Sequence, residues 1–380
     1  MFQNTLGSDI LKGSNFITNL RTGWIRHFAD RLEDPPIVVQ LLGTKDDLVH
    51  REDCMDTELF HNSYHIDVPD GKHGDLHKLD KDSGIKYKLL KEAILGTLEK
   101  QSKKIAAKRE HIIFILHGIR AGNTGWVEQL RSRIHDRDIS IKVVNSAYGY
   151  FSALGFAIPG IRKSKLAWFR DQYSYYLARY PNATFYFIGH SNGTYLLGQS
   201  LIKILNMRFD RVYLAGSVLP RNFDWTKIFD RGQIKALRND RSAFDWPVAW
   251  LCSALRNGLG MKDIGTGGFD GFDVIPAYAD RQEVYFYKGD HGKPLEEHNL
   301  DNILKFILDN TRETPNNIDY NLDVSRWSLI SRWCPVMLWF IFFIIAALVW
   351  VLMSLHFSIV NVIITLLVLL FISIITLKNI

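Results

Sequence analysis

The 380-residue chain has few cysteines, and they lie far apart. Cys54, Cys252 and Cys334 form neither a CxxC pair nor a cluster with histidines, so the sequence indicates neither a disulfide framework nor a zinc site. An odd number of cysteines favours a reducing compartment. The first residues, MFQNTLGSDILKGSNF, lack a basic stretch followed by an apolar core, so we expect no signal peptide.

An excess of charge of one sign is also lacking. The 46 Lys and Arg residues against 40 Asp and Glu give a formal net charge of +6. The basic residues are scattered, and no helix-turn-helix, zinc-finger or RNP pattern occurs, so we expect no nucleic-acid partner. No GxGxxG or P-loop stands in its structural context, and we expect no cofactor.

Glycine is concentrated in one stretch, DIGTGGFDGFD (Asp263–Asp273), which carries three aspartates. Their spacing does not match an EF-hand loop. We therefore expect a flexible insertion here and no metal site.

Apolar residues gather at the C-terminus. Pro335–Leu355 and Ile359–Leu377 carry no formal charge, and only a short turn separates them. At about 1.5 Å per residue, each stretch spans roughly the 30 Å of a bilayer core. The pattern predicts a transmembrane helical hairpin over residues 335–377, after a juxtamembrane linker over 316–334. The alternatives are a hairpin that lies in one leaflet and a hairpin that oligomerises.

The flanking charges predict how this hairpin is oriented. Arg326 and Arg332 precede the first stretch and Lys378 follows the second, whereas the turn has no formal charge. The positive-inside rule then places both ends of the hairpin in the cytoplasm. We expect a membrane protein that faces the cytoplasm and has the lipid bilayer as its partner.

A strand-like run, Thr184–Ile188, leads directly into Gly189-His190-Ser191-Asn192-Gly193, and a helix-like segment follows. A G-x-S-x-G motif between a strand and a helix is typical of a nucleophile elbow. Gly189 and Gly193 would let the strand and the helix approach closely. The motif predicts that Ser191 is a nucleophile.

A second strand-like run, His111–Leu116, ends in His117-Gly118-Ile119. In hydrolases with such an elbow, one backbone N–H of this loop stabilises the developing oxyanion, and the residue after the nucleophile supplies the other. We therefore expect Ile119 and Asn192 to be the oxyanion donors. The alternative is an ordinary strand-to-loop turn.

Strand-like and helix-like segments alternate along the rest of this region, which is typical of a parallel sheet with crossover helices. Helices are expected at Trp126–His135 and Lys165–Tyr180, and strands at Ile139–Val144, Arg211–Ala215, Gln233–Asn239 and Val284–Tyr287. The apolar connection Ala147–Ile161 is a candidate lid or acyl-pocket lining, with ordinary packing as the alternative.

The order of a catalytic triad in this fold is Ser, then Asp or Glu, then His. Asp245 follows the strand at Gln233–Asn239, and Asp240 is its rival. His291 stands in the loop after the last strand, and its rival His298 falls in the first turns of a helix. We expect Asp245 to be the acid and His291 the base.

Five segments resemble, in order, a group of bacterial α/β-hydrolases of the serine-esterase or lipase-like kind: FIGHSNGTYLL, AGSVLPRNFDW, DWPVAW, DIGTGGFDGF and KGDHGKPLEEHNLDNILKFI. The resemblance covers roughly residues 110–310. It implies the triad Ser191, Asp245 and His291, with oxyanion donors at Asn192 and Ile119. Pro247 departs from the pattern, which would have a second valine there.

The first hundred residues carry a second resemblance. A strand at Ile37–Gly43 is followed by Asp46, and a strand at Tyr64–Val68 is followed by His73. This is similar to the back half of an α/β-hydrolase, with no elbow before it. We divide the chain into this segment (1–105) and a catalytic domain (106–315). Half a sheet leaves an unpaired edge, so the segment should pack on the main domain or on another copy of the chain. A plain N-terminal α/β extension is the alternative.

Together these patterns predict a membrane-anchored serine hydrolase of carboxylic esters. A tethered domain meets lipid at high effective concentration, so an amphiphilic ester is the expected substrate. The alternatives are a hydrolase of a soluble ester, thioester or peptide, and a non-catalytic membrane adaptor or sensor.

Overall fold

The structure is a computed structural model. It describes residues 11–31, 38–45, 63–68, 72, 84–95, 110–118, 125–138, 140–144, 159–273, 275–311, 325–354, 364 and 367–368. The chain divides into two compact units. One comprises Met1–Glu110 with Ala167–Thr184, and the other comprises His111–Leu166 with Phe185–Ile380.

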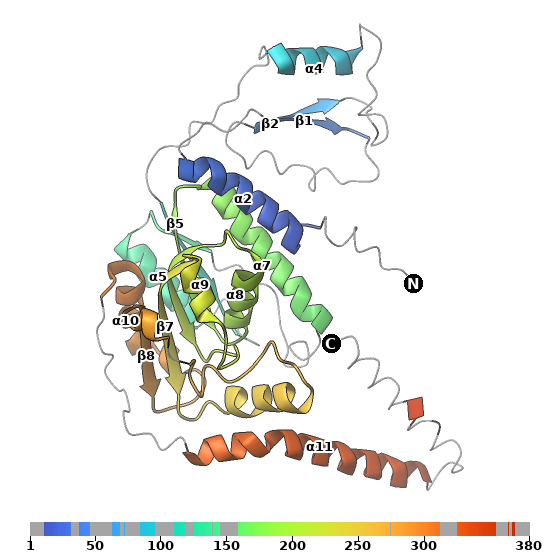
Figure 1. Ribbon diagram of the computed structural model, residues 1–380, viewed down its shortest axis with the longest axis vertical. Coiled ribbons are helices and arrows are strands. Elements are labelled where there is room, and N and C mark those ends of the chain that lie inside the picture. The colour runs from blue at the N-terminus through green and yellow to red at the C-terminus, as the bar shows by residue number, and fades with distance from the viewer. Residues whose placement is uncertain are drawn as a thin grey trace. The chain divides into compact units, whose positions relative to one another are not determined.

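The larger unit is built on a six-stranded sheet with the order β4-β3-β5-β6-β7-β8. Figure 1 labels β5, β7 and β8 of this sheet. The pairs β3–β4, β5–β6, β6–β7 and β7–β8 are all parallel. The strands are β3 (His111–Leu116), β4 (Lys142–Val144), β5 (Thr184–His190), β6 (Phe209–Ala215), β7 (Ile234–Ser242) and β8 (Gln282–Tyr287). The expected parallel sheet with flanking helices is confirmed.

The strand order indicates at which edge of the sheet a ligand would bind. From β3 the chain moves outward to β4, and it then returns to the other side of β3 to form β5. The order therefore reverses between β3 and β5, and ligands of open α/β sheets bind outside the carboxyl ends of the strands at such a point. His117-Gly118 and Ser191 leave the sheet at this edge.

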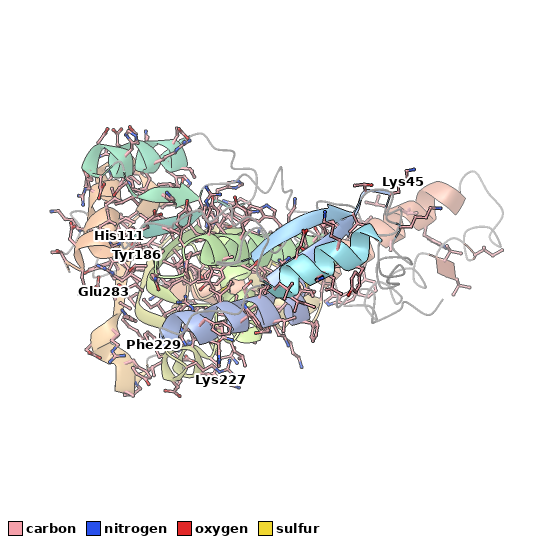
Figure 2. The ribbon with its side chains drawn as sticks, turned by 90° about the horizontal axis from the view of Figure 1, so that it is seen from above. Lys45, His111, Tyr186, Lys227, Phe229 and Glu283 are labelled. Atoms are coloured by element: carbon pink, nitrogen blue, oxygen red, sulfur yellow. The ribbon has the colours of Figure 1, made fainter. Side chains whose placement is uncertain are left out.

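Both faces of the sheet are buried, which explains the nearly continuous apolar strands. Alternate residues of the central strands, among them Ile113, Ile188 and Tyr213, pack in one cluster with side chains of two helices. These helices are α5 (Trp126–Arg137) and α10 (Glu297–Leu304), which is continued by the π-helical turn η7 (Lys305–Asp309). At the beginning of β3 and β5, the rings of His111 and Tyr186 stack at 5.8 Å (Figure 2).

The opposite face is rich in phenylalanine. The rings of Phe114 and Phe187 both pack edge-on against Phe209, at 6.1 and 5.7 Å. Helix α8 (Asn192–Lys203) lies on the other side of the sheet from α5 and α10 (Figure 1). Full burial of one such side chain contributes about 1.5–3 kcal/mol, so this face anchors the strand that carries the elbow.

The glycine-rich segment is a tightly held strap. The N–H groups of Gly265, Gly267 and Gly268 donate to the carbonyls of Val218, Leu219 and Ser217 at 2.7–2.8 Å. A Cβ on Gly268 would lie 2.0 Å from Ser217 N, so only glycine permits this approach. Residues Gly265–Phe269, which we call the strap, are therefore packed on the loop that follows β6. The expectation that this segment is a flexible insertion is wrong.

The larger unit also contains several short helical segments: α9 (Trp225–Asp230), the π-helical turns η3 (Pro247–Cys252) and η4 (Ala254–Gly258), and the 3-10 turns η5 (Pro276–Arg281) and η6 (Lys293–Leu295). Helix α7 (Pro159–Arg179) begins in this unit, and from Ala167 onward it belongs to the smaller one.

The smaller unit contains a two-stranded parallel sheet of β1 (Val38–Gly43) and β2 (Ser63–Val68), with Val38 opposite Ser63. Its helices are α2 (Asn15–Arg31) and α4 (Ile85–Leu95). Within this unit Arg21 of α2 forms an ion pair of 2.9 Å with Asp171. The two strands were expected; Asp46 and His73 lie outside the described residues.

Helix α11 (Ser325–Ser354) contains most of the first apolar stretch. In the part of the chain that the structure describes, no helix combines the length and the apolar character that a membrane crossing requires. Of the second apolar stretch, only residues 364, 367 and 368 are described, and the transmembrane hairpin stays a prediction.

Candidate active site

Ser191 is the single residue between strand β5 and helix α8, and its backbone has a conformation that L-residues rarely adopt. Its φ is 51° and its ψ is −119°, which costs on the order of 1–3 kcal/mol. Hydrogen bonds hold it there: its N–H donates to Ala215 O at 3.0 Å. Its carbonyl accepts from Thr194 N at 2.9 Å and from Thr194 Oγ1 at 2.7 Å. Such strain at a strand–helix turn is the backbone feature of a nucleophile elbow.

The elbow glycines are required by close contacts. A Cβ on Gly189 would lie 2.4 Å from the ring of Phe187, and a Cβ on Gly193 would lie 2.5 Å from Leu116 O. The second contact brings the beginning of α8 against the end of β3. The packing therefore leaves no room for a side chain at Gly189 or Gly193.

The loop after β3 comes close to the serine. A Cβ on Gly118 would lie 2.7 Å from Ser191 Cβ and 3.3 Å from Ser191 Oγ. Asn192 is the first residue of α8 and is buried, and the first N–H groups of a helix have no acceptor within the helix. Ile119 lies outside the described residues, so its predicted role as an oxyanion donor is not tested.

Asp245 and His291 are in direct contact. Asp245 Oδ2 lies 2.8 Å from His291 Nδ1, and the Asp245 side chain is completely buried whereas that of His291 is 20% exposed. Asp245 Oδ1 also accepts from Val248 N at 3.1 Å. Because a carboxylate only accepts hydrogen bonds, Nδ1 of His291 carries the hydrogen, and Nε2 is left as the basic nitrogen.

Pro247 fits this arrangement. It stands at the beginning of η3, the turn that follows Asp245. A proline is tolerated there because the first N–H of a helical turn has no partner within the turn. Asp245 instead receives its backbone donors from later residues: Val248 N reaches the carboxylate and Ala249 N reaches the carbonyl at 2.9 Å.

Gly216 links the serine to the His–Asp pair. It has a φ of +52°, and a Cβ there would lie 2.5 Å from His291 Cε1 and 3.3 Å from Asp245 Oδ2. The preceding residue, Ala215, accepts the hydrogen bond from Ser191 N. At the end of β6, the serine is thus hydrogen-bonded to Ala215, and the His–Asp pair lies against the following residue, Gly216.

Ser191 Oγ makes no hydrogen bond to another residue in the described part of the chain. Catalytic hydrogen bonds of this kind often become short only when a substrate is bound. The geometry thus brings the three predicted triad residues to one edge of the sheet, with the His–Asp contact already formed.

The rival candidates are engaged elsewhere. Asp240 is fully buried, and its two oxygens accept from Arg238 Nε and Nη2, both at 2.9 Å, from Tyr213 Oη at 2.9 Å and from Tyr287 Oη at 3.1 Å. Its carboxylate is therefore saturated by structural donors. His298 is exposed and faces Glu296 at 3.6 Å.

The three aspartates of the glycine-rich segment have separate partners. Asp263 accepts from Tyr195 Oη at 2.8 Å and pairs with Arg162, Asp270 accepts from Thr266, and Asp273 pairs with Arg221 at 2.9 Å. Among the described residues, no group of three or more His, Cys, Asp or Glu side chains could hold a metal ion.

Two further histidines lie close to the site. Burial and the neighbouring His291 hold the pKa of His190 well below its usual value. Burial also lowers the pKa of His117, against the opposing effect of its contact with Gly118 O at 2.8 Å. Sequence reasoning assigned no role to His190 or to Gly216. In the sequence, His190 is marked only as the variable residue before the serine in G-x-S-x-G. Gly216 is marked only by its place directly after a strand.

No known protein family matches the sequence, and no curated protein matches it. Among solved structures, an uncharacterized protein from Bacillus cereus ATCC 10987 is 15% identical, with a TM-score of 0.36 over 60% of this chain and 68% of that chain. The thioesterase domain SrfTE, which cyclizes the lipopeptide antibiotic surfactin, is 13% identical, with a TM-score of 0.31 over 54% of this chain and 93% of that domain.

The chain's own geometry defines its class more directly. It is an α/β protein with a parallel sheet between helices and a strained serine at a strand–helix turn. This arrangement fits an α/β-hydrolase-like fold.

Proposed function

We propose that this chain is a serine hydrolase that cleaves carboxylic esters through an acyl-enzyme. One observation carries the proposal: at the carboxyl edge of a parallel sheet, the strained Ser191 is hydrogen-bonded to Ala215, and the Asp245–His291 pair lies against the next residue, Gly216. A nucleophile, a base and a group that orients the base are the parts that acyl transfer needs.

The proposed chemistry begins with His291 Nε2, which takes the proton of Ser191 Oγ as the oxygen attacks the ester carbonyl. Asp245 keeps the imidazole in the required tautomer and stabilises the imidazolium. The tetrahedral intermediate then collapses: the bond to the alcohol oxygen breaks, and the alcohol leaves with the proton from His291. Water repeats both steps on the acyl-enzyme and releases the acid.

The oxyanion would be stabilised by backbone N–H groups. Asn192 N is favoured because it begins α8 directly after the nucleophile, and a donor from the loop after Gly118, which we assign to Ile119, would be the second. Each such donor contributes about 3 kcal/mol to transition-state stabilisation. Gly118, the residue before Ile119, closely approaches Ser191, which supports this assignment.

We further propose that the substrate is an amphiphilic lipid ester and that the chain is attached to a bacterial inner membrane by residues 335–377, with the hydrolase domain in the cytoplasm. The attachment is supported by the two apolar stretches, which carry no formal charge, and by the arginines before the first of them. Cell fractionation tests the attachment. The chain should stay with membranes after an alkaline carbonate wash, and release by that wash would contradict the proposal.

Covalent labelling with a fluorophosphonate tests the hydrolase assignment. The wild type should be labelled at one site, and Ser191→Ala should not be labelled. Ser132→Ala, which changes an exposed serine of α5, is the matched control and should be labelled like the wild type. A wild type that takes no label would overturn the assignment and favour a non-catalytic adaptor.

The lipid preference is tested separately with p-nitrophenyl esters of increasing chain length, with and without liposomes. We expect kcat/KM to rise with chain length and with liposomes. Equal rates on short and long esters with no liposome effect would instead indicate a soluble ester, thioester or peptide as substrate.

A further inference from the structure

His190, the residue before the nucleophile, contacts the loop that carries His291. Its Nε2 lies 3.2 Å from the backbone oxygen of His291. The centroids of the two imidazole rings are 4.4 Å apart, with an interplanar angle of 43°. On its other side, His190 packs edge-on against Trp126 of α5 at 6.2 Å. One side chain therefore bridges the elbow and the loop of the base.

The contact fixes the tautomer of His190. A carbonyl oxygen only accepts hydrogen bonds, so Nε2 must carry the hydrogen, and Nδ1 of the neutral ring has a lone pair. Nδ1 is buried and has no hydrogen-bond partner among the described residues. A Cβ on Gly118 would lie 3.0 Å from it.

Protonation of His190 would be unfavourable for two reasons. A second N–H would be buried without an acceptor. A positive charge on His190 would also lie next to the imidazole ring of His291, away from water, where the charged form is disfavoured. His117 at the end of β3 is the other titratable neighbour, and burial lowers its pKa too. The lowered pKa of His190 agrees with this picture.

We propose that His190 is a positioning residue for the catalytic base: its Nε2–H bond to the His291 carbonyl, together with the ring contact, holds the His291 loop in register with Ser191. The inference rests on the proposed function only in that His291 acts as the base. Its physical reason is that proton transfer depends on placement, since a misplacement of about 1 Å can cost about 100-fold in rate.

A pair of variants isolates the donor. His190→Gln can place an amide N–H near the position of Nε2, whereas His190→Met has a similar length and no donor. We expect the rate of fluorophosphonate labelling to fall about 10-fold in His190→Met, in line with one lost hydrogen bond, and to stay within about 3-fold of wild type in His190→Gln.

A second readout does not depend on activity. The hydrogen between His291 Nδ1 and Asp245 should give a low-field proton NMR signal, which Asp245→Asn identifies by removing it. We expect the signal to broaden or shift in His190→Met and to return in His190→Gln. A change in protein stability alone would not produce this pattern in samples that are fully folded by near-UV circular dichroism.

The outcomes separate the two proposals. If the wild type takes no label but the NMR signal follows the donor, the hydrolase assignment fails, whereas the hydrogen bond from His190 still holds the His291 loop in place. If the wild type is labelled and His190→Met keeps both the labelling rate and the signal, the positioning role is wrong. Should His190→Met not fold, His190→Asn replaces it, because its shorter amide cannot reach the His291 carbonyl, and the same expectations apply.

Discussion

Replacing Gly216 with alanine should displace the base while the fold survives. The new Cβ would lie 2.5 Å from His291 Cε1 and 2.7 Å from Nδ1. An ordinary carbon–carbon contact is about 3.5 Å, so the ring must move by about 1 Å. A displacement of this size can cost about 100-fold in rate. His291 is partly exposed and can yield, so the loss should fall on activity.

A second glycine separates this displacement from backbone strain. Gly232 has a φ of +63°, close to the +52° of Gly216, and a Cβ there would meet nothing within 4 Å. Gly232→Ala should therefore lose about 1 kcal/mol of unfolding free energy and no activity. Gly216→Ala should show a similar loss of stability and about 100-fold lower kcat/KM.

The assay is hydrolysis of a p-nitrophenyl ester together with urea unfolding of both variants. If Gly216→Ala hydrolyses the ester as fast as Gly232→Ala, then contact with Gly216 does not determine where His291 lies, and the reasoning is refuted.

Three other perturbations have defined outcomes. Asp245→Asn should lower kcat about 10⁴-fold with little change in KM, because the imidazole loses its orienting carboxylate; a loss below about 10-fold in ester hydrolysis would contradict that role. Asp240→Asn should cost about 3–5 kcal/mol in urea unfolding, since it leaves the buried Arg238 without its counter-charge; the exposed Asp273 is the control, and Asp273→Asn should cost less than about 1 kcal/mol. As the pH falls below 6.5, the ordinary pKa of histidine, the free energy of unfolding should decline, because the unfolded chain binds a proton that the folded protein does not accept on His190, whose pKa is lowered by burial. Each such histidine contributes up to about 1.4 kcal/mol per pH unit; equal pH slopes for the wild type and His190→Gln would contradict this.

Local patterns were enough to predict most of the sheet. Apolar, β-rich runs between turn residues gave strands at the positions of β3, β5, β6, β7 and β8, with ends that differ from the structure by a few residues. The elbow was equally readable, because its glycines, serine and flanking elements are adjacent in sequence. Such features depend on neighbours along the chain, which a sequence displays directly.

Other features depend on contacts between distant residues. The sequence left Asp240 and Asp245 as rivals, and the buried donors around Asp240 come from three strands, β6, β7 and β8. The strap was expected to be flexible because glycines are permissive, whereas here they allow close backbone approach to Ser217. No local pattern marks Gly216, because the side chain that requires its small size, His291, is far away in sequence.

Thr194 connects the nucleophile to the support of the base. Its hydroxyl donates to Ser191 O at 2.7 Å, and it accepts from Val218 N at 3.1 Å and from Ser217 Oγ at 3.2 Å. Ser217 and Val218 directly follow Gly216 and are held by the strap. The elbow and the residue that limits the position of His291 are thus bonded to one short backbone segment. A shift of that segment would carry both along, so the distance between Ser191 and His291 should vary less than the position of either residue in the sheet.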